Sequence, residues 1–251
     1  MLEKLVLELL KKGKRLEKRG FLDYREIKVE NNVIPRAEGS SRVKIGNTEV
    51  IAGIKLELSE PFKDEKESGV LIVNAEFAPI AHATFEPGPP SEEAIELARL
   101  VDRLIRSSKT INFEKLKISD ELVYGVFIDI HVINHDGNLL DASALAALNA
   151  LNNCKIPKYE DGKLIRNEII GKLEIKYKPL YCTIACFEDK FLVDLNQYEE
   201  NVVDSKIAIG LKEDNTICAI QLLSGKIDYD KIEKILEIAE EKTKYLRNFV
   251  F

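Results

Sequence analysis

The stretch from Val126 to Leu151 constrains the fold of this chain more than any other part of the sequence. Apolar residues recur at every second position from Val126 to Val132, which is the period of a β-strand. Residues 135–138 are typical of a turn, and the Ala/Leu-rich run from Asp141 to Leu151 predicts a buried helix. A strand that enters a helix through such a turn is a common anion-binding arrangement, because the first helical N–H groups lack partners.

This turn nevertheless lacks the side chains that an anion site usually has. Leu139 and Leu140 stand just before Asp141, and no Arg, Lys, Ser or Thr lies between Asp136 and Asp141. The sequence therefore predicts the backbone of an anion site without the side chains that usually bind the anion. This absence is the main clue to function in the sequence.

Composition excludes several classes of protein. The net charge of −6 over 251 residues gives no global basic field for nucleic acid, so any such contact must use a local patch. Charged residues interrupt every apolar stretch, and the N-terminus has no signal-peptide pattern. We expect a cytoplasmic protein with no membrane contact, no cofactor and no bound metal. Its four cysteines are expected to be free, mostly buried thiols.

The order of the predicted elements indicates an α+β fold with mixed sheets covered by helices. Periodicity and turn residues predict the following segments: a helix over 2–19, an arm over 20–36, a hairpin over 41–58, a charged loop over 61–68, a strand over 70–77, a helix over 91–108, the strand and helix described above, a polar excursion over 157–167, strands over 172–188, 190–194, 207–209 and 217–223, and a last helix over 228–251.

An arginine stripe on the helix over 91–108 is the one local basic feature of interest. Arg99, Arg103 and Arg106 follow one another at helical spacing, and Lys109 comes directly after the helix. Two interpretations stay open. The arginine stems could cover apolar surface and pair with Glu96 or Asp102, or the stripe could contact the phosphates of a nucleic acid.

Two other polar groups are ambiguous from sequence. The acidic segment from Asp194 to Glu200, followed by Asp204, could hold Mg²⁺, although a solvated loop is the favoured interpretation. His131 lies on the same face of its strand as Asp129, which predicts a structural pair rather than a catalytic one.

Several of these segments together resemble the RNase PH family of phosphate-dependent 3′-to-5′ exoribonucleases. The hairpin S-S-R-V-K-I-G-N-T-E-V-I-A-G-I-K, the helix R-L-V-D-R-L-I-R-S-S, the turn D-G-N-L-L-D-A-S and the segment V-D-L-N-Q-Y-E-E are similar to family motifs. The resemblance covers nearly the whole chain. It implies the RNase PH fold, which is of the ribosomal protein S5 domain 2-like type. We expect an N-terminal helix and arm over 1–30, a core domain over 31–188 and a C-terminal subdomain over 189–251.

Two departures from the family pattern bear on activity. Active members carry a Gly-(Ser/Thr)-Arg phosphate-binding motif, whose positions here hold Asn138, Leu139 and Leu140. Active members also have two aspartates six residues apart, and here the second position is Glu200 after Asp194. The resemblance therefore implies a chain that cannot hold the attacking phosphate.

This pattern is similar to the inactive RNase PH-type subunits of the archaeal exosome. The resemblance implies a hexameric ring, a trimer of heterodimers with a catalytic RNase PH-type subunit, and a cap subunit of the S1/KH or zinc-ribbon type. It also implies contact with single-stranded RNA, for which Arg103 and Arg106, then Arg99 and Lys109, are the candidate residues. The alternatives are an independent phosphorolytic exoribonuclease that uses Arg42 or Arg36, and a scaffold that touches no RNA.

Overall fold

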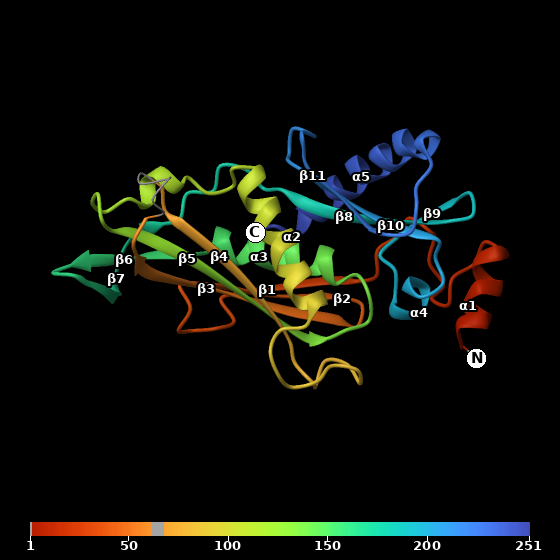
Figure 1. The fold of residues 1–251 in the computed structure, drawn as a ribbon, viewed down its shortest axis with the longest axis horizontal. Coiled ribbons are helices and arrows are strands. Elements are labelled where there is room, and N and C mark those ends of the chain that lie inside the picture. The colour runs from red at the N-terminus through yellow and green to blue at the C-terminus, as the bar shows by residue number, and fades with distance from the viewer. Residues whose placement is uncertain (1, 62–67) are drawn as a thin grey trace.

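The computed structural model describes residues 2–61 and 68–251, and within them a five-stranded sheet, a four-stranded sheet and a two-stranded sheet are combined with helices (Figure 1). The helices are α1 (Leu2–Lys11), α2 (Glu92–Ser107), α3 (Leu139–Asn152), α4 (Gln197–Glu200) and α5 (Ile232–Leu246). The strands are β1 (Ile27–Asn31), β2 (Gly39–Ile45), β3 (Thr48–Ser59), β4 (Val70–Phe77), β5 (Val123–Asn134), β6 (Lys155–Glu160), β7 (Lys163–Lys172), β8 (Leu180–Phe187), β9 (Lys190–Val193), β10 (Ser205–Leu211) and β11 (Ile217–Ser224). This content confirms the predicted mixed α and β fold.

The first sheet has five strands in the order β1-β2-β3-β5-β4. β4 runs parallel to β5, and the other neighbours are antiparallel. The predicted hairpin is confirmed as β2 and β3, which turn at Gly46 with a φ of 58°. Because alternate residues through the middle of β3 and β5, such as Val50 to Leu56 and Val126 to Val132, are apolar and buried, one face of this sheet forms the core.

The second sheet has four strands in the order β11-β10-β8-β9. α5 packs on one face of β8 and β10, while α3 packs against β8 and against the first sheet. The predicted domain division at residue 188 falls in the turn between β8 and β9, which pair directly. We therefore propose that the second unit begins near Leu180.

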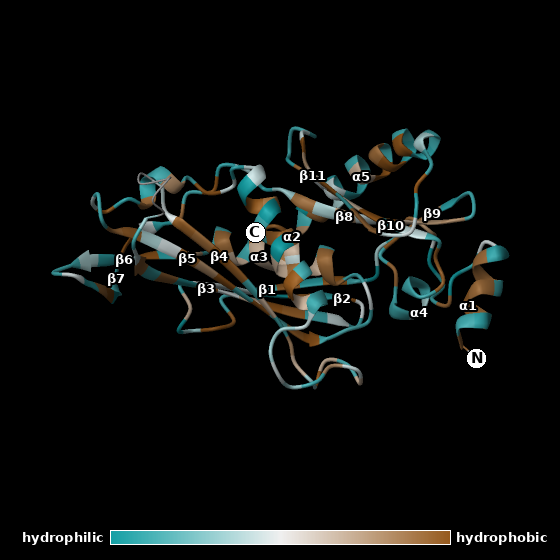
Figure 2. Ribbon diagram, viewed as in Figure 1, coloured by the Kyte–Doolittle hydropathy of each residue, from teal (hydrophilic) through white to brown (hydrophobic). Residues whose placement is uncertain are grey.

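α3 is the buried centre of the fold, as its composition predicts. Ala142, Leu145, Ala146 and Leu151 are fully buried, because both sheets contribute apolar side chains around the helix. Figure 2 shows hydrophobic residues gathered where α3 lies among the strands. The helix begins at Leu139, two residues before the predicted start.

The N-terminal segment differs from its prediction. α1 ends at Lys11 instead of residue 19, because Gly13 takes a left-handed conformation with a φ of 71°. The following arm is also more ordered than predicted, since it contains β1, which pairs with β2.

The polar excursion predicted over 157–167 is wrong, because these residues belong to the β6–β7 hairpin. Mixed charges hid its strand pattern, and ion pairs of Arg166 with Glu38 and Glu57 tie the hairpin to the first sheet. The strand predicted over 172–188 begins only at Leu180. Most of the charged loop predicted over 61–68 lies outside the described residues.

The cysteines are free thiols in the structure, as predicted. Cys154, Cys182 and Cys186 are buried, and Cys218 is half-buried. Burial raises the pKa of Cys154 to about 12, so this thiol stays protonated at neutral pH. Within residues 2–61 and 68–251, no helix is both long and apolar enough to cross a membrane.

Candidate functional site

The turn between β5 and α3 packs directly onto the segment that follows β9. Gly137 has a φ of 79°, and a Cβ atom there would lie 2.3 Å from the carbonyl oxygen of Leu195. Thr48 fixes the turn from the other side, because its hydroxyl donates to the carbonyl of Gly137 at 2.6 Å. Glycine is therefore required at this position both for its backbone conformation and for the close contact.

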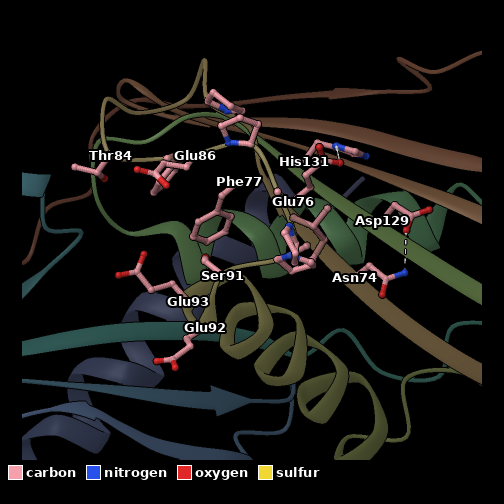
Figure 3. A pocket seen from close by; sticks show the side chains of 18 residues that line it. Asn74, Glu76, Phe77, Thr84, Glu86, Ser91, Glu92, Glu93, Asp129 and His131 are labelled. Carbon is pink, nitrogen blue, oxygen red and sulfur yellow. Dashed lines mark hydrogen bonds and ion pairs between the residues drawn. The ribbon is translucent and has the colours of Figure 1, made fainter.

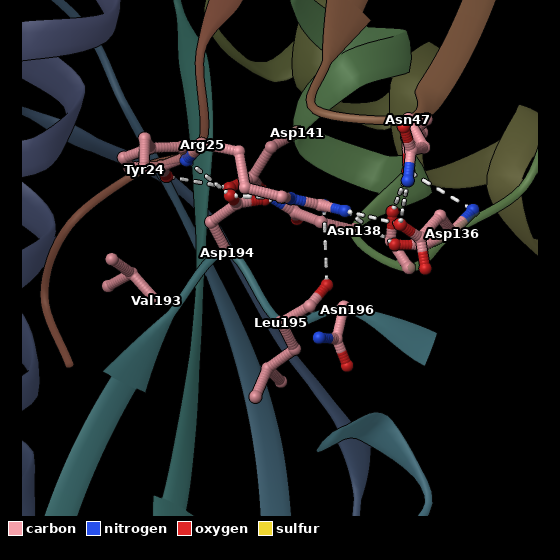
Figure 4. A network of polar contacts seen from close by, with 12 residues as sticks. Tyr24, Arg25, Asn47, Asp136, Asn138, Asp141, Val193, Asp194, Leu195 and Asn196 are labelled. Atoms are coloured by element: carbon pink, nitrogen blue, oxygen red, sulfur yellow. Dashed lines mark hydrogen bonds and ion pairs between the residues drawn. The ribbon is translucent and has the colours of Figure 1, made fainter. Parts of the chain in front are cut away.

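Asn138 brings the start of α3 together with two carboxylates. Its backbone N–H donates to Oε1 of Glu200 at 2.9 Å. Its side-chain amide donates to Oδ1 of Asp194 at 2.9 Å (Figure 4). The carboxylate of Glu200 thus lies at the N-cap of α3 and bonds the backbone N–H that precedes its first turn. Lys206 lies 3.5 Å from the other oxygen of Glu200 and partly offsets its charge.

Asp194 is fully buried and is neutralised by Arg25. The backbone N–H and the Nε of Arg25 donate to Oδ2 at 2.7 and 2.9 Å, and Nη2 donates to Oδ1 at 2.8 Å. Burial alone would raise the pKa of Asp194, but the hydrogen bonds and charge of Arg25 hold that pKa below its ordinary value. Nη1 of Arg25 also donates to the carbonyl of Asp136 at 2.7 Å, which joins the arm to the turn.

Asp141 points into the core rather than towards the turn. It accepts hydrogen bonds from the backbone N–H and the hydroxyl of Thr183 at 2.9 and 2.8 Å, and from the hydroxyl of Tyr24 at 2.7 Å. Burial raises the pKa of Asp141 to about 6, although these hydrogen bonds act in the opposite direction. The carboxyl therefore fixes the arm and β8 to the first turn of α3.

Glu199 forms a second buried ion pair beside the first. Arg15 donates to both of its carboxylate oxygens, at 2.8 Å for the Nε contact, and also to the carbonyls of Val193 and Asp194. The predicted solvated loop is therefore wrong for Asp194 and Glu199, because arginines from the N-terminal segment bury both. The described residues include no group of three or more acidic, histidine or cysteine side chains that could hold a metal.

Leu139 and Leu140 occupy the two positions that follow Asn138 in the predicted phosphate-binding motif. Leu140 is buried, and Leu139 is half-buried and packs against the main core. Neither side chain has a donor for an anion. The turn therefore has no side-chain donor for an anion, as its sequence predicts. The neighbouring carboxylates make the turn still less suited to a phosphate.

The arginine stripe lies on the exposed side of α2, whose N-cap Ser91 accepts from the N–H of Ala94 as predicted. Arg106 is held by Asp102, at 2.8 Å, and by the carbonyl of Leu71, at 2.5 Å. The interpretation that an arginine of the stripe pairs with Asp102 is thus confirmed for Arg106. Its guanidinium has little freedom to contact a ligand.

Arg99 and Arg103 are much freer than Arg106. Arg103 donates only to the side chain of Gln221 at 3.0 Å, and Arg99 makes no ion pair with any residue that the structure describes. Both line a surface hollow of about 490 Å³ between α2 and β4. Lys109 is exposed beyond the helix end and has a left-handed backbone with a φ of 57°.

The prediction that His131 pairs with Asp129 was wrong. Nδ1 of His131 lies 3.3 Å from Glu76 on the neighbouring strand, while Asp129 accepts from the amide of Asn74 at 3.2 Å. Adjacent strands bring these side chains closer than positions two apart on one strand. Sequence reasoning also missed Arg15 and Arg25, for which no local pattern gives a signal.

Two family models match this chain, and they place its fold in a known class. The model of the 3′ exoribonuclease family, domain 1, matches residues 23–157, and the model of domain 2 of the same family matches residues 179–242. The chain therefore belongs to the 3′ exoribonuclease (RNase PH) family. The predicted family and fold are confirmed.

Among members of this family, the chain is similar to curated proteins called exosome complex component Rrp42. It is 41% identical to the protein of Methanothermobacter thermautotrophicus over 98% of this chain and 93% of the relative. It is 43% identical to the protein of Pyrococcus abyssi over 98% of this chain and 92% of the relative.

Solved structures give the same relationship. A chain of the Archaeoglobus fulgidus exosome, described with RNA bound to the active site, superposes with a TM-score of 0.91 at 40% identity, over 98% of this chain and 96% of that one. A chain of an archaeal exosome core superposes with a TM-score of 0.87 at 38% identity, over 98% and 95% of the two chains.

The Arg25–Asp194 pair makes a strong prediction for stability. Arg25→Met leaves a fully buried carboxylate without its main cation, which we expect to lower the free energy of unfolding by about 3 to 5 kcal/mol. Urea unfolding measures this loss. Because Asp194→Asn removes the uncompensated charge, the double variant should be more stable than Arg25→Met alone. A single variant that costs less than about 1 kcal/mol would contradict the assignment.

The raised pKa of Asp141 predicts that the free energy of unfolding depends on pH. Its pKa is about 6 in the folded chain and about 3.9 when unfolded, so the folded state binds more protons in between. The resulting stabilisation is full below about pH 4 and is lost as pH rises through 6. The stability difference between the native chain and Asp141→Asn should therefore fall by roughly 2 kcal/mol from pH 4 to 7. A difference that stays constant over this range would refute it.

Proposed function

We propose that this chain is a non-catalytic subunit of an archaeal exosome, and that it acts beside a catalytic RNase PH-type subunit in the degradation of single-stranded RNA. The names of its relatives and of the similar solved structures support membership of such a complex. The observation that carries the non-catalytic role is the apolar packing of Leu139 and Leu140 in the first turn of α3, which offers an anion no hydroxyl or guanidinium group.

Phosphorolysis needs a bound phosphate close to the bond that it cleaves. At the start of α3, a phosphate would have to displace the Glu200 carboxylate, and it would then face Asp194 without an arginine or hydroxyl from positions 139 and 140. Like charges at such short range oppose binding. Arg25 does not provide a substitute site, because its guanidinium is buried and already donates to Asp194 and Asp136.

The second part of the proposed role is RNA contact through α2. Arg99 and Arg103 are exposed and border one hollow, so two guanidinium groups are available to phosphates of a passing strand. Lys109 extends the basic side beyond the helix. Arg106 is the weakest of the four candidates, because Asp102 and Leu71 already hold it. Contacts of this kind do not depend on base sequence.

The assembly is proposed from the resemblance and from the relatives. In this proposal the chain pairs with a catalytic RNase PH-type subunit, three such heterodimers close a hexameric ring, and an S1/KH or zinc-ribbon subunit caps one face. The complex works in the cytoplasm. No metal or cofactor is required by this chain for its part in the reaction.

An independent phosphorolytic exoribonuclease is the alternative that the sequence left open, with Arg42 or Arg36 holding phosphate. Arg42 lies 2.6 Å from Glu49 and within 4.0 Å of Glu30, so two carboxylates compete for it. No observation favours this alternative over the non-catalytic role.

The RNA contact predicts a salt-dependent loss of affinity. Arg99→Ala with Arg103→Ala should weaken binding of single-stranded RNA to the assembled ring, because two phosphate contacts are removed. The slope of log affinity against log salt should become shallower by about 1.4, and Arg106→Ala should have a smaller effect. Filter binding or fluorescence anisotropy at several salt concentrations measures both quantities.

A matched control for this experiment is Lys226→Ala with Lys244→Ala, which removes the same charge from exposed sites outside α2. The control should leave the salt slope unchanged. Equal affinity and equal slope for the arginine variant and the native ring would overturn the placement of RNA on α2.

A further inference from the structure

Among the strands that the structure describes, β4 pairs only with β5, so it is an edge strand of the first sheet. The carbonyl of Leu71 faces away from β5, since it accepts from Arg106. Backbone groups alternate in direction along a strand, so those of Val73, Ala75 and Phe77 also face outward. Within the described part of the chain, these outward groups have no hydrogen-bond partner.

A groove of about 1,020 Å³ runs past the end of this open edge (Figure 3). Its walls are residues 74–77 of β4, residues 129–131 of β5, the loop over residues 84–90, and the N-cap and first residues of α2, 91–93. The rings of Phe77 and Phe85 pack 4.9 Å apart and provide an apolar part of its surface. The groove therefore offers free backbone groups and apolar contact area side by side.

The groove has a strongly acidic lining. Five carboxylates border it: Glu76, Glu86, Glu92, Glu93 and Asp129. Among the described residues, no Lys or Arg lines the groove, and His131 lies against Glu76. Glu86, Glu92 and Glu93 are exposed and form no ion pair with a described residue. A negative groove of this kind favours a cationic occupant and repels the phosphates of RNA.

We propose that the open edge of β4 is a docking site for an extended, basic segment of a partner protein, which joins the first sheet as a further strand. Its backbone would bond to Ala75 and Phe77, and its Lys or Arg head groups would meet the carboxylates of the groove. Val73 is not part of this site, because it lies in the hollow that the arginines of α2 line. Their aliphatic stems would pack on Phe77 and Phe85. The inference rests on the proposed function in one respect, which is that the partner belongs to the same complex.

Hydrogen exchange on the assembled complex tests this proposal. The chain is mixed with the catalytic RNase PH-type subunit of the same organism, and amide exchange is followed in free and assembled samples. We expect the amides of Ala75 and Phe77 to exchange at least tenfold more slowly in the complex. Glu86→Lys with Glu93→Lys should abolish much of this protection, because the segment would then meet like charges.

Glu96→Lys with Glu233→Lys is the matched control, since it makes the same change of charge at exposed sites outside the groove. It should leave the protection intact. Assembly without slower exchange at β4 would overturn the docking site and leave the proposed function standing. Protection that rises with concentration in the free chain would identify a second copy as the occupant, and would also overturn it. Failure to assemble would overturn both proposals.

Discussion

The buried ion pair between Arg25 and Asp194 is the interaction on which the rest of the site depends. It joins the N-terminal arm to the segment after β9 and, through Asp136 and Asn138, to the turn before α3. Removing two charges from water is costly unless their remaining hydrogen-bonding groups are also satisfied, and here the surrounding turn provides these partners. The two sheets are therefore linked at this place by polar contacts as well as by the apolar surface of α3.

One consequence of this network is that the anion position at α3 is satisfied from within the chain. Glu200 takes the free N–H of Asn138, Arg25 neutralises Asp194, and Leu140 is buried. The basic groups that stay available lie elsewhere, on the exposed side of α2. A chain with this distribution of charge is suited to guiding RNA beside another subunit's active site, and poorly suited to activating phosphate itself.

Local sequence patterns predicted the parts of the fold that depend on local rules. The β2–β3 hairpin, α2 with its Ser91 cap and the buried α3 follow from alternation, capping and composition. The Arg25–Asp194 pair could not be predicted, because it joins residues 169 positions apart and neither lies in a distinctive pattern. For the same reason the acidic segment was interpreted as solvated, since its composition does not reveal the arginines that bury it. The turn's lack of phosphate ligands was visible in the sequence, whereas the occupation of the site by Glu200 required the structure.

The measurement that tests the central claim most directly is phosphorolysis by the purified chain. Labelled single-stranded RNA is incubated with inorganic phosphate and Mg²⁺, first with this chain alone and then with the catalytic RNase PH-type subunit added. The absence of a phosphate-holding side chain at Leu139 and Leu140 predicts no release of nucleoside diphosphates from the chain alone, and release once the catalytic subunit is present. Release of nucleoside diphosphates by the chain alone would contradict the account, because phosphate would then bind despite Glu200, Leu139 and Leu140.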